Sequence, residues 1–536
     1  MNIKTIFYTL FLATCISQSL SARTLKVMGT VTDTHGTPLQ GIVVSDGYSC
    51  VQTDIHGRYN FTRHEAAYYV HYSIPAEYEV PLRYGIPTFY KKLDRDSIYN
   101  FVLIPKKGGA DKAFSIFFMA DPQCQNIRHV RRFHCETVAD IKKFAKKTKT
   151  PNYGITLGDI GYTEGEFNTT YILPFMKEEM EADNIGMPVF QTNGNHDQIY
   201  NGLALNEQNP SAMVRFKRMF EDIFGPINYS WNRGDAHIIS MDNVMYDVLN
   251  TASKYHGEFT AEQLEWLKKD LSFVPKDKLI IFCCHIPVYS TKNKEAVLNL
   301  LGQFENRVIY TGHIHTSTYH MHQNGTKEYN LAAASGCWWW SRCNGDGTPN
   351  GYKVVKVAGN KIVNQLWKST GFDQKFQIRL YRGNSRFGGP YEECQLPFSK
   401  DIVLANVFAW DEHWKVEVYE DNQYKGELKR MPATHKEDQH PSLTSSKDWW
   451  AIGFNTGVIG RGHIGTSNRN SYINTCNHMF MYKMSNPNAK IKVIATDPYG
   501  NKYEQSKFVD TDAFRPGNTV YVDDTPPAYP EDPVWK

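Results

Sequence analysis

Five short polar clusters recur through the middle of the chain, and each follows an apolar run of strand length. In open α/β sheets, side chains at the carboxyl ends of the strands meet in one crevice. We therefore expect the five clusters to converge on one site. The clusters are Asp121-Pro122-Gln123, Gly158-Asp159, Gly194-Asn195-His196-Asp197, His285 and Gly312-His313-Ile314-His315.

The spacing of the clusters predicts an α/β domain over residues 113–370. Successive clusters lie 38, 36, 90 and 28 residues apart, which suits one strand–helix unit per interval and an insertion in the third. Helical patterns such as 138–147 and 261–271 alternate with the apolar runs, and this alternation indicates a layered sheet covered by helices. The predicted strands are 114–119, 153–157, 188–191, 237–241, 279–284 and 308–310.

The side chains of the clusters favour a metal site. Carboxylates, neutral imidazoles and amide oxygens are ligands for hard or borderline divalent cations, and there are enough of them for two ions. Glycines beside Asp159, Asn195 and His313 allow tight turns and close approach of the backbone. A single Asp or His at a strand end is usually a cap or a surface group, so the inference depends on the ordered set.

This ordered set resembles the calcineurin-like metallophosphoesterase family, whose pattern is D-x-H, G-D, G-N-H-[DE], a lone His and G-H-x-H. Four of the five blocks match fully and in order, and the resemblance covers the middle domain. It implies a four-layer αββα core and a hydrolase that acts on phosphate ester bonds. It also implies two divalent metal ions as cofactors.

The resemblance further implies roles for individual residues. It assigns Asp121, Gln123, Asp159 and His315 to the first ion, and Asp159, Asn195, His285 and His313 to the second. His196 would act as the acid or stabiliser of the leaving oxygen, and Asp197 would orient its imidazole. The implied reaction is in-line attack on phosphorus by a metal-bound hydroxide.

One position departs from the family pattern, because Gln123 stands where the family usually has His. A neutral amide oxygen is a harder and generally weaker ligand than imidazole for iron or zinc. We therefore favour manganese, magnesium or iron over two zinc ions, and the occupancy of the first position stays open. The alternative is an exported binding protein with a degenerate metal site.

Two β-rich regions flank the predicted α/β domain. Residues 23–107 contain short alternating stretches separated by turn residues, and the runs 29–41 and 54–61 resemble the carboxypeptidase-regulatory, transthyretin-like β-sandwich. This second resemblance implies a fold and no activity. The helical signals fade after residue 370, so residues 371–536 predict a C-terminal β-rich domain, with strands at 376–381, 415–419 and 490–495.

The first 22 residues predict a signal peptide. Lys4 provides a positive start, residues 6–16 an apolar stretch and Ala22 a small-residue exit that suits cleavage. An uncleaved anchor and lipidation at Cys15 are the alternatives. We expect an exported protein, periplasmic or on the cell surface, whose mature chain has no transmembrane helix.

The run Trp338-Trp339-Trp340 follows the last predicted ligand. Three consecutive side chains cannot all face one side of a strand. Two interpretations stay open: a wall for a sugar, lipid or nucleobase part of the substrate, and packing between the α/β domain and the following β domain. Nearby, Cys337 and Cys343 could pair across a loop.

The charge balance bears on the partner. Lys and Arg number 59 and Asp and Glu 56, so the net charge is +3 over 536 residues, and this near balance disfavours nucleic acid as a partner. The expected partner is a phosphate-ester substrate, with lipid, sugar and cell-envelope phosphates as candidates. Monoesters and diesters stay open, because both use the same metal core. The oligomeric state is also open.

Overall fold

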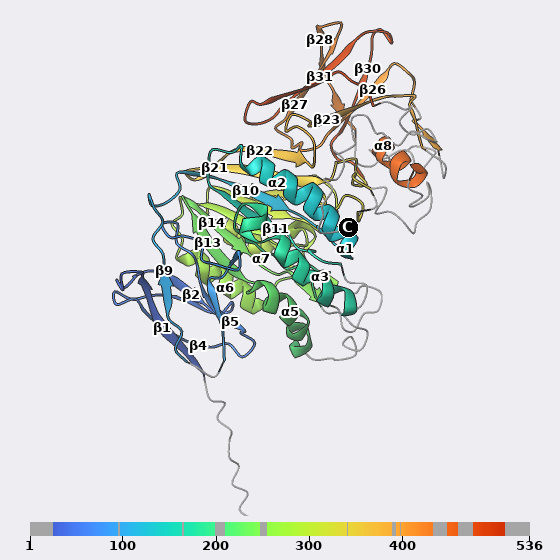
Figure 1. Ribbon diagram of the computed structural model, residues 1–536. Helices are drawn as coiled ribbons and strands as arrows, with labels where there is room; N and C mark the ends of the chain where they lie inside the picture. Colours follow the sequence, from blue (N-terminus) through green and yellow to red (C-terminus); the bar gives the residue numbers. More distant parts are fainter. Residues whose placement is uncertain are drawn as a thin grey trace, which may run out of the picture.

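A computed structural model of the chain describes residues 25–94, 97–162, 166–198, 210–246, 255–339, 341–388, 393–396, 398–431, 447–458 and 475–509. The predicted signal peptide, including Cys15, lies outside the described residues. Within them the chain forms an N-terminal β region, a central α/β region and a C-terminal β region (Figure 1).

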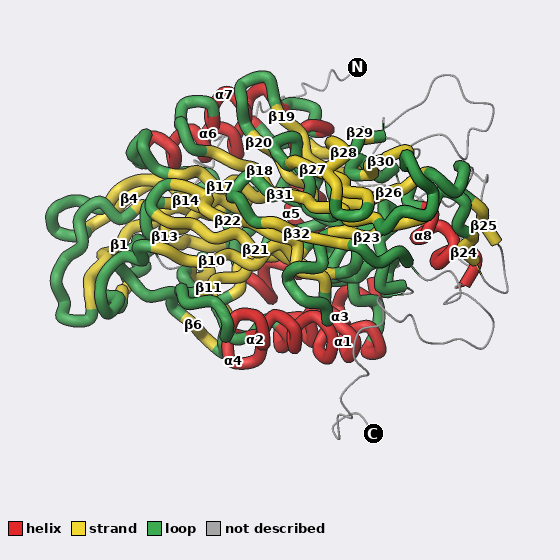
Figure 2. Tube along the Cα trace, turned by 90° about the horizontal axis from the view of Figure 1, so that it is seen from above, coloured by secondary structure: helices red, strands yellow, loops and turns green. Residues whose placement is uncertain are grey.

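Two mixed sheets form the centre of the molecule and lie between two layers of helices (Figure 2). The five-stranded sheet has the order β12-β11-β10-β21-β22, and the six-stranded sheet has the order β13-β14-β17-β18-β20-β19. Helices α1 to α4 lie outside the first sheet, and α6 and α7 lie outside the second. This is the four-layer αββα core that the sequence resemblance implied.

The strands of this core include all six predicted from the sequence. Their bounds are β10 (Ala113–Met119), β11 (Asn152–Thr156), β12 (Val189–Phe190), β13 (Tyr229–Arg233), β14 (Ala236–Ser240), β17 (Leu279–Cys283), β18 (Arg307–Thr311), β19 (Thr318–Met321), β20 (Lys327–Asn330), β21 (Gly351–Ala358) and β22 (Lys361–Ser369), with a hairpin of β15 (Val244–Tyr246) and β16 (Tyr255–Gly257). The helices are α1 (Ile127–Arg132), α2 (Ala139–Ala145), α3 (Glu166–Glu179), α4 (Ala182–Ile185), α5 (Pro210–Phe224), α6 (Ala261–Ser272) and α7 (Lys294–Leu301), and a π-helical turn over Phe133–Val138 joins α1 to α2.

The apolar runs become central strands because both faces of each sheet are covered. Phe118 of β10 stacks on Tyr310 of β18 with ring centroids 4.3 Å apart, and both side chains are fully buried between the sheets. β10 and β11 are parallel and end at paired residues, and the parallel strands β17 and β18 end within one residue of each other. Within each sheet, the loops that follow these strands therefore lie side by side at the carboxyl ends of the strands.

The N-terminal region consists of two small sheets with the orders β4-β1-β9 and β3-β2-β5-β8. It contacts the central region through side chains. The Trp266 indole donates to Ser45 Oγ at 2.8 Å, and the buried Arg233 guanidinium donates to the carbonyl oxygens of Ala76 and Tyr78. The strands are β1 (Lys26–Asp33), β2 (Val43–Ser45), β3 (Cys50–Gln52), β4 (Arg58–Thr62), β5 (Tyr69–Tyr72), β6 (Leu82–Arg83), β7 (Ile86–Pro87), β8 (Tyr90–Lys92) and β9 (Phe101–Leu103).

The C-terminal region also contains two four-stranded sheets, with the orders β23-β26-β30-β29 and β28-β27-β31-β32. Its three predicted strands are confirmed as β23, β27 and β31. No helix among the described residues is long and apolar enough to cross a membrane. The elements are β23 (Ile378–Arg382), β24 (Arg386–Gly388), β25 (Glu393–Gln395), β26 (Ile402–Val407), β27 (Lys415–Glu420), β28 (Gln423–Glu427), β29 (Lys429–Arg430), α8 (Trp449–Ile452), β30 (Met479–Lys483), β31 (Ile491–Thr496) and β32 (Lys502–Gln505).

Candidate metal centre

The seven predicted ligands come together from loops of both sheets. Those from the five-stranded sheet follow β10, β11 and β12, and those from the six-stranded sheet follow β17 and β18. The site thus lies at the carboxyl ends of strands from two facing sheets, and not in the crevice of a single sheet. The ligands are Asp121, Gln123, Asp159 and Asn195 from the first sheet and His285, His313 and His315 from the second.

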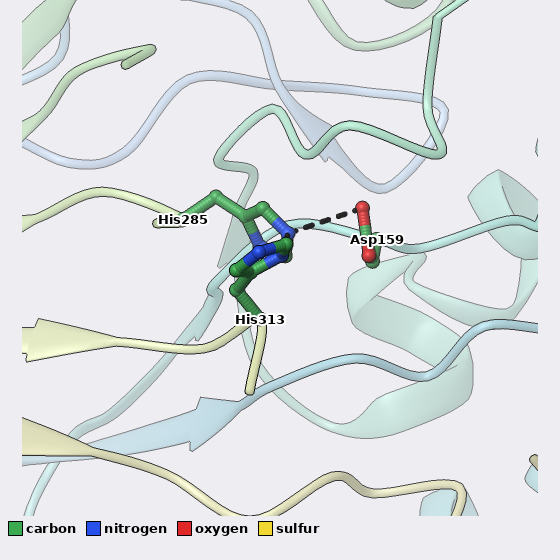
Figure 3. A group of neighbouring side chains, drawn as sticks. All are labelled: Asp159, His285 and His313. Atoms are coloured by element: carbon green, nitrogen blue, oxygen red, sulfur yellow. Dashed lines mark hydrogen bonds and ion pairs between the residues drawn. The ribbon is translucent and has the colours of Figure 1, made fainter. Parts of the chain in front are cut away.

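Four of these side chains form a tight group around His285. One ligand atom each from Asp159, His285 and His313 lie within 4.8 Å of one another (Figure 3). The Nε2 atom of His285 is 3.2 Å from Asp159 Oδ1, 3.2 Å from His313 Nδ1 and 2.9 Å from Asn195 Oδ1. These are the four residues predicted to bind the second ion.

The ligands predicted for the first ion lie beside this group. Gln123 Nε2 donates to Asp159 Oδ2 at 2.9 Å, and His315 Nε2 lies 3.3 Å from Asp121 Oδ1. Gln123 Oε1 and His315 Nδ1 are buried, and neither atom has a hydrogen-bond partner in the described structure. Buried polar atoms are normally paired. Two orphaned acceptors beside two carboxylates therefore fit divalent cations.

The backbone around the site is strained. Five of the seven ligands have positive φ angles, which is uncommon for residues other than glycine and costs about 1–3 kcal/mol each. The motif glycines are required for space, since a Cβ atom on Gly312 would lie 2.6 Å from Asp121 Oδ2 and one on Gly194 would overlap Asp159. The strained ligands are Asp121 (49°), Gln123 (41°), Asp159 (52°), His313 (76°) and His315 (51°).

Hydrogen bonds and charges set the orientation and the protonation of the imidazoles. The Nδ1–H of His285 donates to the Leu157 carbonyl oxygen at 2.7 Å, which directs Nε2 towards Asp159. Burial opposes a charge on His285, yet the Asp159 carboxylate raises the pKa of His285 to about 9. Burial also opposes ionisation of Asp159, but the His285 and His196 imidazoles lower its pKa. Burial lowers the pKa of His313 to about 3, so this imidazole is neutral, the form that binds metal.

Three family descriptions match successive parts of the chain. Residues 114–317 match the calcineurin-like phosphoesterase family, residues 25–106 match its N-terminal region and residues 328–503 match its C-terminal region. The chain belongs to the calcineurin-like phosphoesterase family. With the ligand geometry, this membership supports divalent metal ions as the cofactors of the protein.

Curated relatives match only part of this chain. Acid phosphatase type 7 of Mus musculus is 29% identical over 156 residues, which are 28% of this chain and 32% of the relative. The probable glycerophosphodiester phosphodiesterase GpdQ of Arcobacter nitrofigilis is 26% identical over 181 residues, which are 31% of this chain and 57% of the relative. The chain thus spans about a third of the length of the first relative and just over half of the length of the second. A dimetal phosphatase structure from Danio rerio covers 48% of this chain and 96% of its own, at 15% identity and a TM-score of 0.33.

His196 and Asp197 follow the predicted ligand Asn195. The His196 backbone N–H donates to Asp159 Oδ1 at 2.8 Å, and its ring stacks on Tyr162 with centroids 4.3 Å apart. Both Asp197 oxygens accept backbone N–H groups at 2.9 Å, from Gly161 and Gly194. These contacts show that the Asp197 carboxylate holds the loop backbone, and its orientation of the His196 imidazole stays a prediction. Burial and the Asp159 carboxylate raise the pKa of Asp197 to about 7.

The tryptophan run divides into parts with different surroundings. Trp338 is half-buried, and its ring centroid lies 5.1 Å from that of His315. Trp339 is buried against Phe133 and Arg132, so these contacts of Trp339 lie within the α/β region. Trp340 lies outside the described residues.

Cysteines near this run and in the central strands are reduced in the structure. Cys337 and Cys343 are both buried and no disulfide joins them, so the pairing considered for them is not seen in the described structure. Cys283 and Cys284 are buried free thiols in and just after β17, as expected for small apolar residues.

The C-terminal region contacts the loop that carries His313 and His315. Ser317, two residues after His315, donates its backbone N–H to Asp346 Oδ2 at 2.7 Å and its hydroxyl to the Phe408 carbonyl oxygen at 2.8 Å. His478 Nε2 lies 3.2 Å from the same Asp346 oxygen. The last ligand loop is therefore supported by residues far along the chain.

Sequence reasoning missed three tyrosines at the site. Tyr162 stacks on His196, Tyr246 donates its hydroxyl to the Asn195 carbonyl oxygen at 2.7 Å, and the Tyr255 ring lies 5.7 Å from the His313 ring. Two signals were available. Tyr162 lies three residues after a ligand, and the hairpin that carries the other two occupies the long third interval between clusters.

Proposed function

We propose that this protein is an exported metallophosphoesterase that hydrolyses phosphate mono- or diesters. The observation that carries the proposal is the convergence of carboxylate, imidazole and amide ligand atoms from five strand ends, with Asp159, His285 and His313 within 4.8 Å of one another. A metal pair, when bound, supplies an activated water and neutralises phosphoryl oxygens.

Asp159 is placed to serve both halves of the site. Its Oδ1 atom faces His285, and its Oδ2 atom accepts the Gln123 amide. This arrangement supports the bridging role that the family pattern gives to Asp159. The Gln123 amide is turned so that its N–H contacts the carboxylate, which leaves Oε1 for an ion.

His196 is the group best placed to act on the ester. Its backbone N–H holds Asp159, and its ring is fixed by the Tyr162 stack. A neutral imidazole keeps one ring N–H, which can donate a hydrogen bond to the leaving-group oxygen as negative charge develops there. Such assistance is typically worth about 10²–10⁴ in rate.

A comparison of two chromogenic esters tests the substrate class. p-Nitrophenyl phosphate tests a monoester and bis-p-nitrophenyl phosphate a diester, each with chelator-treated protein and with added Mn²⁺. We expect turnover with Mn²⁺ only, and a loss of about 10²-fold or more in His196→Ala. His56→Ala, at an exposed turn of the N-terminal region, is the control and should keep full activity. The names of the curated relatives, an acid phosphatase and a phosphodiesterase, support testing both classes.

Two outcomes would reject the proposal. Protein that binds Mn²⁺ without turning over either ester would favour the exported binding protein with a degenerate site. Protein that binds no metal, with Asp159→Ala indistinguishable from the wild type in turnover, would exclude the metal centre itself.

The proposed export depends on residues 1–22. The sequence of this segment suggests cleavage after Ala22 and release to the periplasm or the cell surface. N-terminal sequencing of protein recovered from a fractionated host tests this. A mature chain that still begins at Met1 in the cytoplasmic fraction would refute export.

A further inference from the structure

A segment that follows β20 holds the first ligand loop by three consecutive carbonyl oxygens. The Ala120 oxygen accepts the backbone N–H of Ala334 at 2.7 Å. The Asp121 oxygen accepts the Ser335 hydroxyl at 2.9 Å, and the Pro122 oxygen accepts the Trp339 indole N–H at 2.7 Å. We call residues 334–339 the clamp segment. It contacts the backbone of the loop that carries Asp121 and Gln123.

The other side of the same loop is bonded to the neighbouring ligand loop. The backbone N–H of Gln123 donates to the Asp159 carbonyl oxygen at 2.8 Å, and that of Asp121 donates to the Gly158 oxygen at 3.3 Å. The first ligand loop therefore lies between the clamp segment and the loop of Asp159. Both its carbonyl and its N–H groups are used to hold it.

Holding is needed because the loop is strained. Asp121 and Gln123 have φ angles of 49° and 41°, and Trp338 and Trp339 in the clamp segment have angles of 46° and 63°. Residues other than glycine keep such conformations only where their surroundings determine them. Without the clamp segment, the ligand loop would be free to relax towards ordinary backbone angles.

Trp339 is itself anchored firmly. Its side chain is 4% exposed, and the Arg132 guanidinium lies 5.2 Å from the indole ring and donates to the Trp339 carbonyl oxygen. Arg132 is paired in turn with Glu136 one helical turn away, at 2.7 Å. The indole N–H is thus presented to Pro122 by a side chain with little freedom to move.

We propose that Ser335 and Trp339 are positioning residues for the first metal ion, acting through the backbone of the Asp121–Gln123 loop. This inference rests on the proposed function, since it requires that the loop binds a metal. It gives Trp339 a role distinct from that of Trp338, whose ring lies beside His315. Outer groups that orient metal ligands typically contribute a factor of about 10–100 in metal affinity.

The test replaces the indole donor and keeps an aromatic ring. Trp339→Phe leaves the Pro122 oxygen without its N–H donor. Trp367→Phe is a matched control, because Trp367 is 2% exposed and donates its indole N–H to the Pro349 carbonyl oxygen at 3.1 Å, outside the ligand loops. Binding of Mn²⁺ to the full, chelator-treated chain is measured by calorimetric titration and by metal content at low free Mn²⁺.

We expect Trp339→Phe to bind one Mn²⁺ ion about 10–100-fold more weakly and the other within about threefold of the wild type. Raising the Mn²⁺ concentration should restore turnover. Trp367→Phe should bind both ions as the wild type does. A merely structural role for Trp339 would not produce this selective loss or the rescue by metal.

Four results would overturn the inference. Trp339→Phe could bind both ions with wild-type affinity, or both tryptophan variants could lose affinity equally. If Trp339→Phe does not fold, Ser335→Ala decides instead: about tenfold weaker binding of one ion supports the inference, and wild-type binding overturns it. A wild-type chain that binds no Mn²⁺ would refute the proposed function and the inference together, whereas the other outcomes leave the proposed function intact.

Discussion

Lys217 of α5 and Asp242, which follows β14, form a buried ion pair behind the loop of Asn195. Their side chains are 11% and 1% exposed. Asp242 also accepts the Asn193 side-chain amide at 2.9 Å and the Val244 backbone N–H at 3.1 Å. Lys217→Met would keep the length of the side chain and remove its charge. The Asp242 carboxylate would then stay buried without its counter-charge.

The expected cost follows from the burial of the pair. Removing one partner of a buried ion pair costs about 3–5 kcal/mol, because the other charge is left uncompensated. In a domain of this size, 1 kcal/mol shifts the unfolding temperature by about 2–4 °C, so Lys217→Met should lower it by about 6–20 °C. The pair of Lys92 and Asp222 provides a matched control, since these side chains are 55% and 50% exposed. Exposed pairs contribute about 0–1 kcal/mol, so Lys92→Met should cost at most about 4 °C.

Scanning calorimetry of the chelator-treated proteins would measure both shifts under one condition. The double variant Lys217→Met, Asp242→Asn should recover much of the loss, because no unpaired charge remains buried. Equal shifts for Lys217→Met and Lys92→Met would refute the assignment of a large electrostatic cost to burial. A double variant less stable than Lys217→Met would do the same.

Further predictions concern packing, ion binding and pH. Gly194→Ala should weaken Mn²⁺ binding and lower turnover by about 10²-fold, because the added Cβ overlaps Asp159, and unchanged binding in a titration would contradict this. Mn²⁺ at a hundred times its dissociation constant should stabilise the folded chain by about 2.7 kcal/mol, visible as a higher unfolding temperature than in chelator, and no shift would speak against a metal site. Burial lowers the pKa of Lys353 from 10.5 to about 8, so between pH 8 and 10.5 the unfolded chain binds more protons than the folded chain. The free energy of unfolding should therefore rise by about 3 kcal/mol through that window because of Lys353. Lys353→Met should remove this rise in urea unfolding measured at several pH values, and an unaltered slope would show that Lys353 is not the source.

The convergence of the predicted ligands could be expected from the sequence, because each of these residues follows a strand whose apolar run is visible there. Asp159 and His285 illustrate this, since β11 and β17 end just before them. The contribution of two sheets was not visible in the spacings, because strand order depends on packing between segments far apart in the chain. The presence of two sheets was expected only because the family resemblance implied it. The edge hairpin β21–β22, which pairs antiparallel with β10, was also missed.

The supporting contacts were harder to predict than the ligands. Besides its predicted role beside His196, the Asp197 carboxylate accepts two backbone N–H groups, and a motif does not display such contacts. Ser335 and Trp339 act on backbone carbonyl oxygens, which every residue has. A sequence pattern therefore cannot mark which oxygens are contacted. Domain packing was one of two interpretations of the tryptophan run, and neither interpretation distinguished Trp339, which contacts Phe133 and Arg132.

The order of residues along the chain has a consequence for synthesis and folding. Every predicted ligand precedes residue 316, whereas β21, Asp346 and Phe408, which pair with or support the ligand-bearing elements, come later. A nascent chain thus carries the whole ligand set long before it can shape the site. A fragment that ends with the match at residue 317 would hold all the ligands yet lack the contacts that fix them. Metal loading should accordingly be a late event in maturation, after the last domain has folded.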